Sequence, residues 1–319
     1  MFTLSGRLFV GATLSVSLLY GCANSAAPSI PSSSVDVTRL SHQEPNGSIF
    51  GKWMYLAQLY GEDLLVYRRM KFTLTLVETL TQGVSSPQGT MATVNGWWYV
   101  ANGGASNVLV YQSKREGPQR RKDMTLNDPG QFPANVYVTP DRRLVAVSNA
   151  SSSSSGAGSV SVYLDRQRNP ARTLTYGSDP VQGTGIGIYR RNCYWAFNDP
   201  KTRSGTIVDF SRCQGSGTPI VSSIANAAGI TFDQQGNLYY IDQPVGIYKC
   251  KKTAHCSVFS TGFDLPVNLN FDKKDSTLWV ADAGGYIYAV DPKTGKIVFT
   301  MQAGGPTNPP FGIAPAPGG

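Results

Sequence analysis

A short apolar strand that ends in a polar residue recurs six times along this chain, and this repeat constrains the fold more than any other feature. The runs are WMYLAQ, WWYVAN, LVAVSN, YWAFND, LYYID and LWVAD, and their last residues, called the marker residues below, are Gln58, Asn102, Asn149, Asp199, Asp242 and Asp282. Successive markers lie 44, 47, 50, 43 and 40 residues apart. This period is the length of one four-stranded propeller blade. The repeat therefore predicts an all-β chain with six blades.

A second, shorter run precedes five of the markers at a nearly constant interval. These runs open at Gly89, Ala134, Gly185, Gly229 and Asn268, and the marker follows after 13, 15, 14, 13 and 14 residues. Gln58 has no such run before it, whereas the run FGIAP around Gly312 has no marker strand after it. A propeller buries its blade faces and edges best when the ring is closed. We therefore predict a six-bladed β-propeller of four-stranded antiparallel blades over residues 49–315, closed by a C-terminal strand in the N-terminal blade, with a tail at 316–319.

The N-terminus has the pattern of an export signal. Arg7 precedes the apolar run LFVGATLSVSLL, which is shorter than the roughly 20 residues that a membrane span needs. The segment then resembles the cleavage box of bacterial lipoproteins through Leu19, Gly21 and Cys22, although Tyr20 stands where a small residue is usual. The resemblance implies a signal peptide at residues 1–21 and a lipid on Cys22. The alternative is an ordinary secretory signal with an incidental cysteine.

Lipidation would place the protein in the bacterial cell envelope, in the outer membrane facing the periplasm or at the cell surface. Several acyl chains would anchor it stably, because a single chain binds membranes only marginally. The stretch after Cys22, up to residue 48, is rich in Ser, Pro and Ala. Such composition predicts a disordered tether between the lipid and the propeller.

Four further cysteines are expected to pair, because a bacterial envelope is oxidising. Cys250 and Cys256 flank the short connection KKTAH, and Cys193 and Cys213 flank a longer hairpin. Symmetry about each hairpin would place both pairs on opposed antiparallel positions, within reach of a disulfide bond. Free buried thiols are the alternative, and zinc is disfavoured because only His255 lies nearby.

The chain is basic, with a formal net charge of +8, and loss of Arg7 with the signal peptide leaves +8 − 1 = +7. The basic residues fall mostly in expected turns and outer strands. Such charges keep edges soluble, and they can also attract an anionic surface such as lipid headgroups or envelope polysaccharide. No recognition motif for nucleic acid accompanies them, so we expect no nucleic-acid partner. We expect a monomer.

Three segments of the repeat resemble NHL-type repeats: YVANGGASNVLVY at 99–111, GITFDQQGNLYYID at 229–242 and LWVADAGGYIYAVD at 278–291. The resemblance extends over about residues 50–314 in degenerate copies. The group includes six-bladed lactonases of the gluconolactonase kind, which hold a divalent metal with Glu, Asn and Asp, a lyase that needs histidine, and many binding proteins.

The catalytic residues of these enzymes have no recognisable counterpart in the chain. Glu62 and Glu116 fall in expected turns, Glu78 falls in an expected outer strand, and His255 lies in a peripheral hairpin. We therefore expect no catalytic residues and predict a membrane-anchored, non-catalytic module that binds a protein, peptide or glycan. The alternative is a divalent-metal-dependent lactonase of the gluconolactonase type.

The six marker residues form a candidate polar ring near one face. Carboxylate and amide oxygens are ligands for a hard cation such as calcium. Asn and Asp at strand ends also bind local backbone and shape turns. We expect this structural role, with no bound cofactor, and keep a calcium site as the alternative.

Overall fold

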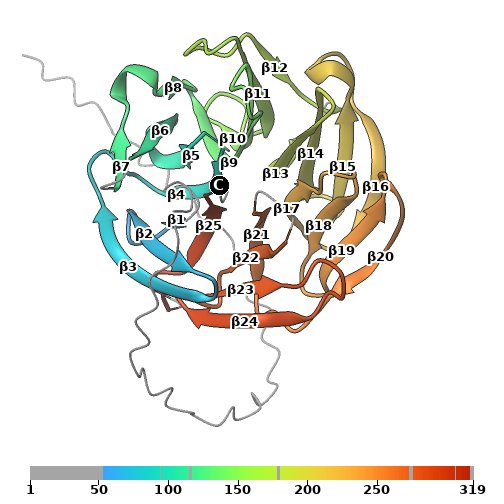
Figure 1. Ribbon diagram of the computed structural model, residues 1–319. Coiled ribbons are helices and arrows are strands. Elements are labelled where there is room, and N and C mark those ends of the chain that lie inside the picture. Colours follow the sequence, from blue (N-terminus) through green and yellow to red (C-terminus); the bar gives the residue numbers. More distant parts are fainter. Residues whose placement is uncertain are drawn as a thin grey trace, which may run out of the picture. The chain divides into compact units, whose positions relative to one another are not determined.

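The computed structural model describes residues 53–316, apart from residues 94, 115–116, 178–179, 273–275 and 306. They form six four-stranded antiparallel sheets around a central axis, as Figure 1 shows. The predicted fold class, a six-bladed β-propeller, is therefore confirmed. The predicted signal peptide, the lipid site at Cys22 and the tether lie outside the described residues.

Each blade has an inner strand at the axis, followed outward by a second, a third and an outer strand. The inner strands are β25 (Pro310–Pro315), β4 (Pro87–Ala92), β9 (Gln131–Val138), β13 (Gln182–Tyr189), β17 (Ala227–Phe232) and β21 (Pro266–Phe271). The second strands, which carry the markers, are β1 (Trp53–Gln58), β5 (Trp97–Asn102), β10 (Leu144–Ser152), β14 (Asn192–Asp199), β18 (Leu238–Asp242) and β22 (Leu278–Asp282).

The third strands are β2 (Asp63–Met70), β6 (Asn107–Lys114), β11 (Ser159–Leu164), β15 (Ser204–Phe210), β19 (Gly246–Lys251) and β23 (Tyr286–Val290). The outer strands are β3 (Thr73–Leu80), β7 (Gly117–Arg120), β12 (Arg172–Leu174), β16 (Thr218–Ile224), β20 (Ala254–Ser260) and β24 (Ile297–Gln302). A short additional strand, β8 (Leu126–Asn127), also pairs with β6. Blades are numbered 1 to 6 from the blade that contains β1.

The two ends of the repeat complete one sheet, as the sequence predicts. Blade 1 has the order β25-β1-β2-β3, with Ala57 of β1 opposite Gly312 of β25. The pairing continues past β25, because the backbone N–H of the buried Ala316 donates to the carbonyl of Trp53 at 2.9 Å. The unpaired edges of β1 and β25 thereby satisfy each other, and the ring closes without an extra strand.

Aromatic side chains of the second strands fill the spaces between blades. Trp98, Trp195 and Trp279 are fully buried, and Tyr55 of blade 1 stacks on Trp98 of blade 2 with ring centroids 4.2 Å apart. Stacked aromatic pairs add to the stabilisation from burial alone. These tryptophans thus pack between neighbouring blades.

Glycine at the inner strands lets neighbouring blades approach closely at the axis. A Cβ on Gly312 would lie 2.2 Å from the carbonyl oxygen of Gln88 in the next blade. A Cβ on Gly229 would lie 2.9 Å from the Cα of Asn268, again in the next blade. Real Cβ atoms do not come this close to a backbone, so the small residue that opens most inner strands is a packing requirement.

Two disulfide bonds join the predicted cysteine pairs. Cys250 and Cys256 are direct partners in the β19–β20 ladder, as predicted. Cys193 and Cys213 are also bonded, but the predicted opposition is wrong for them, because Phe210 is the register partner of Cys193. Cys213 lies three residues beyond Phe210, in the short 3-10 helix η4 (Ser211–Cys213), which turns it back toward Cys193.

The antiparallel order gives the ring two distinct faces. The marker face carries the ends of the second strands, their turns into the third strands, and the links between blades. The basal face carries the turns from inner to second strands and from third to outer strands. Because Gln58 ends β1 at the marker face, Trp53 enters the propeller at the basal face.

Candidate functional site

Three of the six marker residues hold the backbone that leads into their own blade. Asn102 Oδ1 accepts a hydrogen bond from the N–H of Ser85 at 2.7 Å. Asp242 Oδ1 accepts from the N–H of Ala225 at 2.9 Å. Each marker thereby fixes the link that brings the preceding blade to the axis, which is a structural role of Asx side chains.

Asp282 shows this role most fully. Its carboxylate accepts hydrogen bonds from the N–H groups of Asp264 at 3.0 Å, Leu265 at 2.9 Å and Gly284 at 2.7 Å. Burial raises the pKa of the Asp282 carboxyl, although these N–H donors oppose the shift. The oxygens of such a side chain are already occupied by donors, so this arrangement does not fit a shared cation shell.

The other three markers depart from this pattern. Gln58 donates through Nε2 to the carbonyl oxygens of Ala303 and Asn308, each at 2.9 Å, and its Oε1 accepts from Asn308 Nδ2 at 3.1 Å. Asp199 turns toward its own turn and accepts from the N–H of Lys201 at 2.8 Å. No hydrogen bond joins two marker residues in the described part of the chain. The candidate polar ring thus consists of separate local contacts.

Asn149 belongs to a buried polar network in blade 3. Its Nδ2 donates to the hydroxyls of Ser159 at 3.1 Å and Ser161 at 3.0 Å, and Ser161 donates to Asp128 Oδ1 at 2.7 Å. Asp128 Oδ2 and Asn149 Oδ1 are buried without a partner among the described residues. Burial raises the pKa of Asp128 to about 6, so its carboxyl gains a proton under mildly acidic conditions.

Amide side chains bridge the inner strands at the axis. Asn270 of β21 donates through Nδ2 to the carbonyls of Thr90, at 2.9 Å in β4, and Ile313, at 2.7 Å in β25. Asn268 Oδ1 accepts from the N–H of Ile313 at 3.3 Å. The sequences of the six inner strands contain no Asp, Glu, His, Lys or Arg. The amide side chains at the axis therefore hydrogen-bond backbone groups of the inner strands, and no side chain of these strands titrates near neutral pH.

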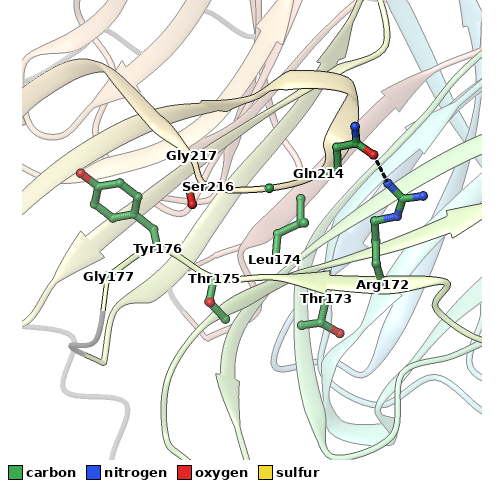
Figure 2. A pocket seen from close by; sticks show the side chains of 10 residues that line it. Arg172, Thr173, Leu174, Thr175, Tyr176, Gly177, Gln214, Ser216 and Gly217 are labelled. Atoms are coloured by element: carbon green, nitrogen blue, oxygen red, sulfur yellow. Dashed lines mark hydrogen bonds between the residues drawn. The ribbon is translucent and has the colours of Figure 1, made fainter.

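A cleft of about 530 Å³ lies at the periphery, between the outer strand of blade 3 and the turn that follows β15 in blade 4. Figure 2 shows two runs of residues facing each other across it, 172–177 and 214–217. At one end Arg172 Nη1 donates to Gln214 Oε1 at 3.0 Å. At the other end lies the phenol ring of Tyr176, whose ring centroid is 5.4 Å from that of Phe197.

The cleft lining is rich in hydrogen-bonding groups. Thr173, Thr175 and Ser216 carry hydroxyls, Gln214 carries an amide, and Arg172 supplies the cation. A cleft with hydroxyl, amide and guanidinium groups beside an aromatic ring can hold a polar, hydroxylated ligand. The repeat pattern gave no indication of this cleft, because it depends on a short outer strand and on the η4 turn, which lie outside the repeated runs.

Across residues 53–316, excluding the undescribed positions, no three His, Cys, Asp or Glu side chains lie close enough to hold a metal. The predicted peripheral position of His255 is found, on the exposed strand β20. In the same described residues, no helix has the length and apolar character of a membrane span.

Comparison with known proteins supports the fold. No protein-family model matches the chain, and no curated protein matches it. Among solved structures, it is similar to a protein of unknown function from Desulfotomaculum acetoxidans DSM 771, with a TM-score of 0.54 and 12% identity, covering 83% of this chain and 99% of that one. It is also similar to a candidate 6-phosphogluconolactonase from Bacteroides fragilis NCTC 9343, with a TM-score of 0.57 and 11% identity, covering 85% and 99%. At such identities the likeness is one of fold, and fold alone does not define function.

Proposed function

We propose that this chain is a non-catalytic binding module of the bacterial envelope, held to a membrane by a lipid on Cys22. The apolar run before Cys22 and the polar segment after it support the anchor, and the two disulfides suit an oxidising compartment. The likeness of residues 99–111, 229–242 and 278–291 to NHL-type repeats agrees with a binding role, since many members of that group only bind.

The peripheral cleft beside Arg172 is the observation that carries the binding role. Its guanidinium, amide and hydroxyl groups, together with the Tyr176 ring, favour a glycan as ligand. The inner strands at the axis carry no Asp, Glu, His, Lys or Arg, which disfavours acid–base or metal chemistry there.

Binding to envelope glycans tests this role. Arg172→Ala and Tyr176→Ala in the full chain should each weaken retention on immobilised cell-wall or outer-membrane glycan roughly tenfold, as expected when an interaction worth about 1.4 kcal/mol is lost. Arg203→Ala, on the marker face of blade 4, serves as the control. Equal retention of all three variants, or retention on peptide ligands alone, would refute a glycan ligand in this cleft.

The anchor is tested separately. Metabolic labelling with a palmitate analogue should mark the wild type and leave Cys22→Ala unlabelled. The competing lactonase function requires a metal. A stoichiometric divalent ion in the purified protein, lost on Asn149→Ala or Asp199→Ala, would replace the binding role with the enzymatic one.

A further inference from the structure

The exposed positive charges of the propeller are segregated onto its basal face. The turn from the third to the outer strand of each blade carries an exposed cation in or beside it: Lys71, Lys114, Arg166, Arg212, Lys252 and Lys293. The turns from inner to second strands add Arg143, Arg190 and Arg191, all exposed. All six blades therefore contribute to one ring of positive charge.

Few negative charges balance this ring. In the described basal turns, Asp141 and Asp165 are exposed and Asp291 is half-buried; Asp165 is paired with Arg143 at 2.9 Å, and Asp291 accepts from the N–H of Lys293 at 2.8 Å. Asp233 and Asp272 on the same face are buried. The surplus of cations thus faces solvent.

The marker face has a different charge pattern. Its described turns and links between blades contribute three exposed cations, Lys122, Lys201 and Arg203, and three exposed anions, Glu62, Asp123 and Asp264. A dispersed solubilising charge would populate both faces alike. The segregation instead gives the ring a positive side and a nearly neutral side.

We propose that the basal face lies flat against a lipid bilayer that contains anionic headgroups. A ring of cations drawn from every blade matches an extended anionic plane better than a small ligand, which would need charges that converge. Met70, at the β2–β3 turn beside Lys71, is 59% exposed on this face and can enter the headgroup region.

The position of the chain entry favours lipid over a soluble polyanion. Trp53, the first residue that the structure describes, begins β1 at the basal face. This argument rests on the proposed lipid at Cys22. An anchored chain then presents its basic face to the bilayer and its marker face outward, and the electrostatic contact supplies the second membrane signal that lipid anchors use.

Vesicle sedimentation tests the surface independently of the anchor. The probe protein is the full chain with Cys22→Ala, so that no acyl chain can bind the membrane. It should bind vesicles containing phosphatidylglycerol and not vesicles of phosphatidylcholine alone, and added salt should weaken the binding. Equal binding to both vesicle types would overturn the proposal.

Blade 4 offers a matched pair of double variants at opposite ends of β14. Arg190→Glu with Arg191→Glu reverses two cations of the basal face, and Lys201→Glu with Arg203→Glu reverses two of the marker face. The basal variant should bind the anionic vesicles roughly tenfold more weakly, and the marker variant should bind like the parent. Both variants should melt at the temperature of the parent, which shows that they are folded. Equal loss in both variants refutes the proposal, as does binding to soluble dextran sulfate without binding to vesicles. If labelling of Cys22 fails while this pattern holds, the anchor is wrong and the basal surface stands.

Discussion

The Arg142 side chain is buried without a carboxylate partner among the described residues. It is 7% exposed, and its guanidinium carbon lies 3.5 Å from the ring centroid of Trp97. Its Nε donates to the Tyr99 hydroxyl at 2.9 Å. Stacking and a neutral hydrogen bond therefore compensate for the lost hydration of this charge.

Replacement of Arg142 should be costly for this reason. Arg142→Ala leaves the Tyr99 hydroxyl without this partner and opens a gap over Trp97, so we expect the free energy of unfolding to fall by about 2–4 kcal/mol. Arg142→Lys should recover less than half of this loss, because an ammonium cannot stack as a plane. Urea unfolding measures both.

The adjacent Arg143 is the control for this experiment. Its side chain is 69% exposed and pairs with Asp165 on the surface. Arg143→Ala should change stability by no more than about 0.5 kcal/mol. Equal losses at the two positions would contradict the packing role assigned to Arg142.

Asp128 should make the stability of the fold depend on pH. Its folded pKa of about 6 lies above its ordinary value near 4, so the folded state binds this proton more tightly than the unfolded chain. The stabilisation is complete below about pH 4 and is lost as pH rises through 6, by about 2–3 kcal/mol in total. Asp128→Asn should therefore be more stable than the wild type at pH 8 and nearly equal near pH 4, by thermal unfolding at each pH. If the stability difference between the wild type and Asp128→Asn stays the same from pH 4 to pH 8, the pKa of the buried Asp128 carboxyl is not raised.

At the scale of the element, β25 shows how a strand depends on its neighbour in the next blade. Gly312 faces the Gln88 carbonyl so closely that any side chain must displace backbone. Gly312→Ala should lower the free energy of unfolding by about 1–3 kcal/mol through overpacking. Gly305→Ala, where an added Cβ has no atom within 4 Å, should be neutral. Similar stabilities of the two variants in urea would show that the inner strands are less tightly packed than described.

The two disulfides close loops of different length and should contribute unequally. Cys193 and Cys213 are separated by 20 positions, and Cys250 and Cys256 by 6. In the chain-entropy description the longer loop contributes about 3 kcal/mol and the shorter about 2 kcal/mol. Paired Cys→Ala variants, compared by urea unfolding, should show the larger loss for Cys193 and Cys213. The reverse order would show that native-state contacts outweigh the loop entropy.

At the scale of the whole molecule, stability depends on closure of the ring. Ile313 and Ala314 of β25 are fully buried between blades, and their strand covers the edge of β1. Deletion of residues 307–319 should lower the melting temperature by roughly 10 °C or more. Addition of the peptide 307–319 should restore part of this loss in proportion to its concentration, as expected for a ligand of the folded state. An unchanged melting temperature after deletion would contradict closure by β25.

The fold was predictable because a blade is a local unit with a fixed length. The markers and the small residues that open the inner strands repeat at intervals set by strand and turn lengths, and the two incomplete repeats could complete only each other. The cysteine pairs were predictable for the same local reason. The opposition of Cys193 and Cys213 was not, because the η4 turn shifts the chain by three residues in a way that no periodicity records.

The marker residues show the limit of such reasoning about function. Their types allowed either a cation ring or backbone caps, and the geometry favours caps at Asn102, Asp242 and Asp282. The cleft at Arg172 and Tyr176 could not be foreseen, because its two walls belong to different blades and come together only in the closed ring.

The sequence by itself determined the number of blades, their closure and the cysteine partners, since these follow from spacing along the chain. Only the tertiary structure decided which side chains share a face. The register of each antiparallel pair places the basic turns on one face of the ring and the markers on the other. The face on which a charged side chain lies is therefore decided by strand pairing, which spacing along the chain does not specify.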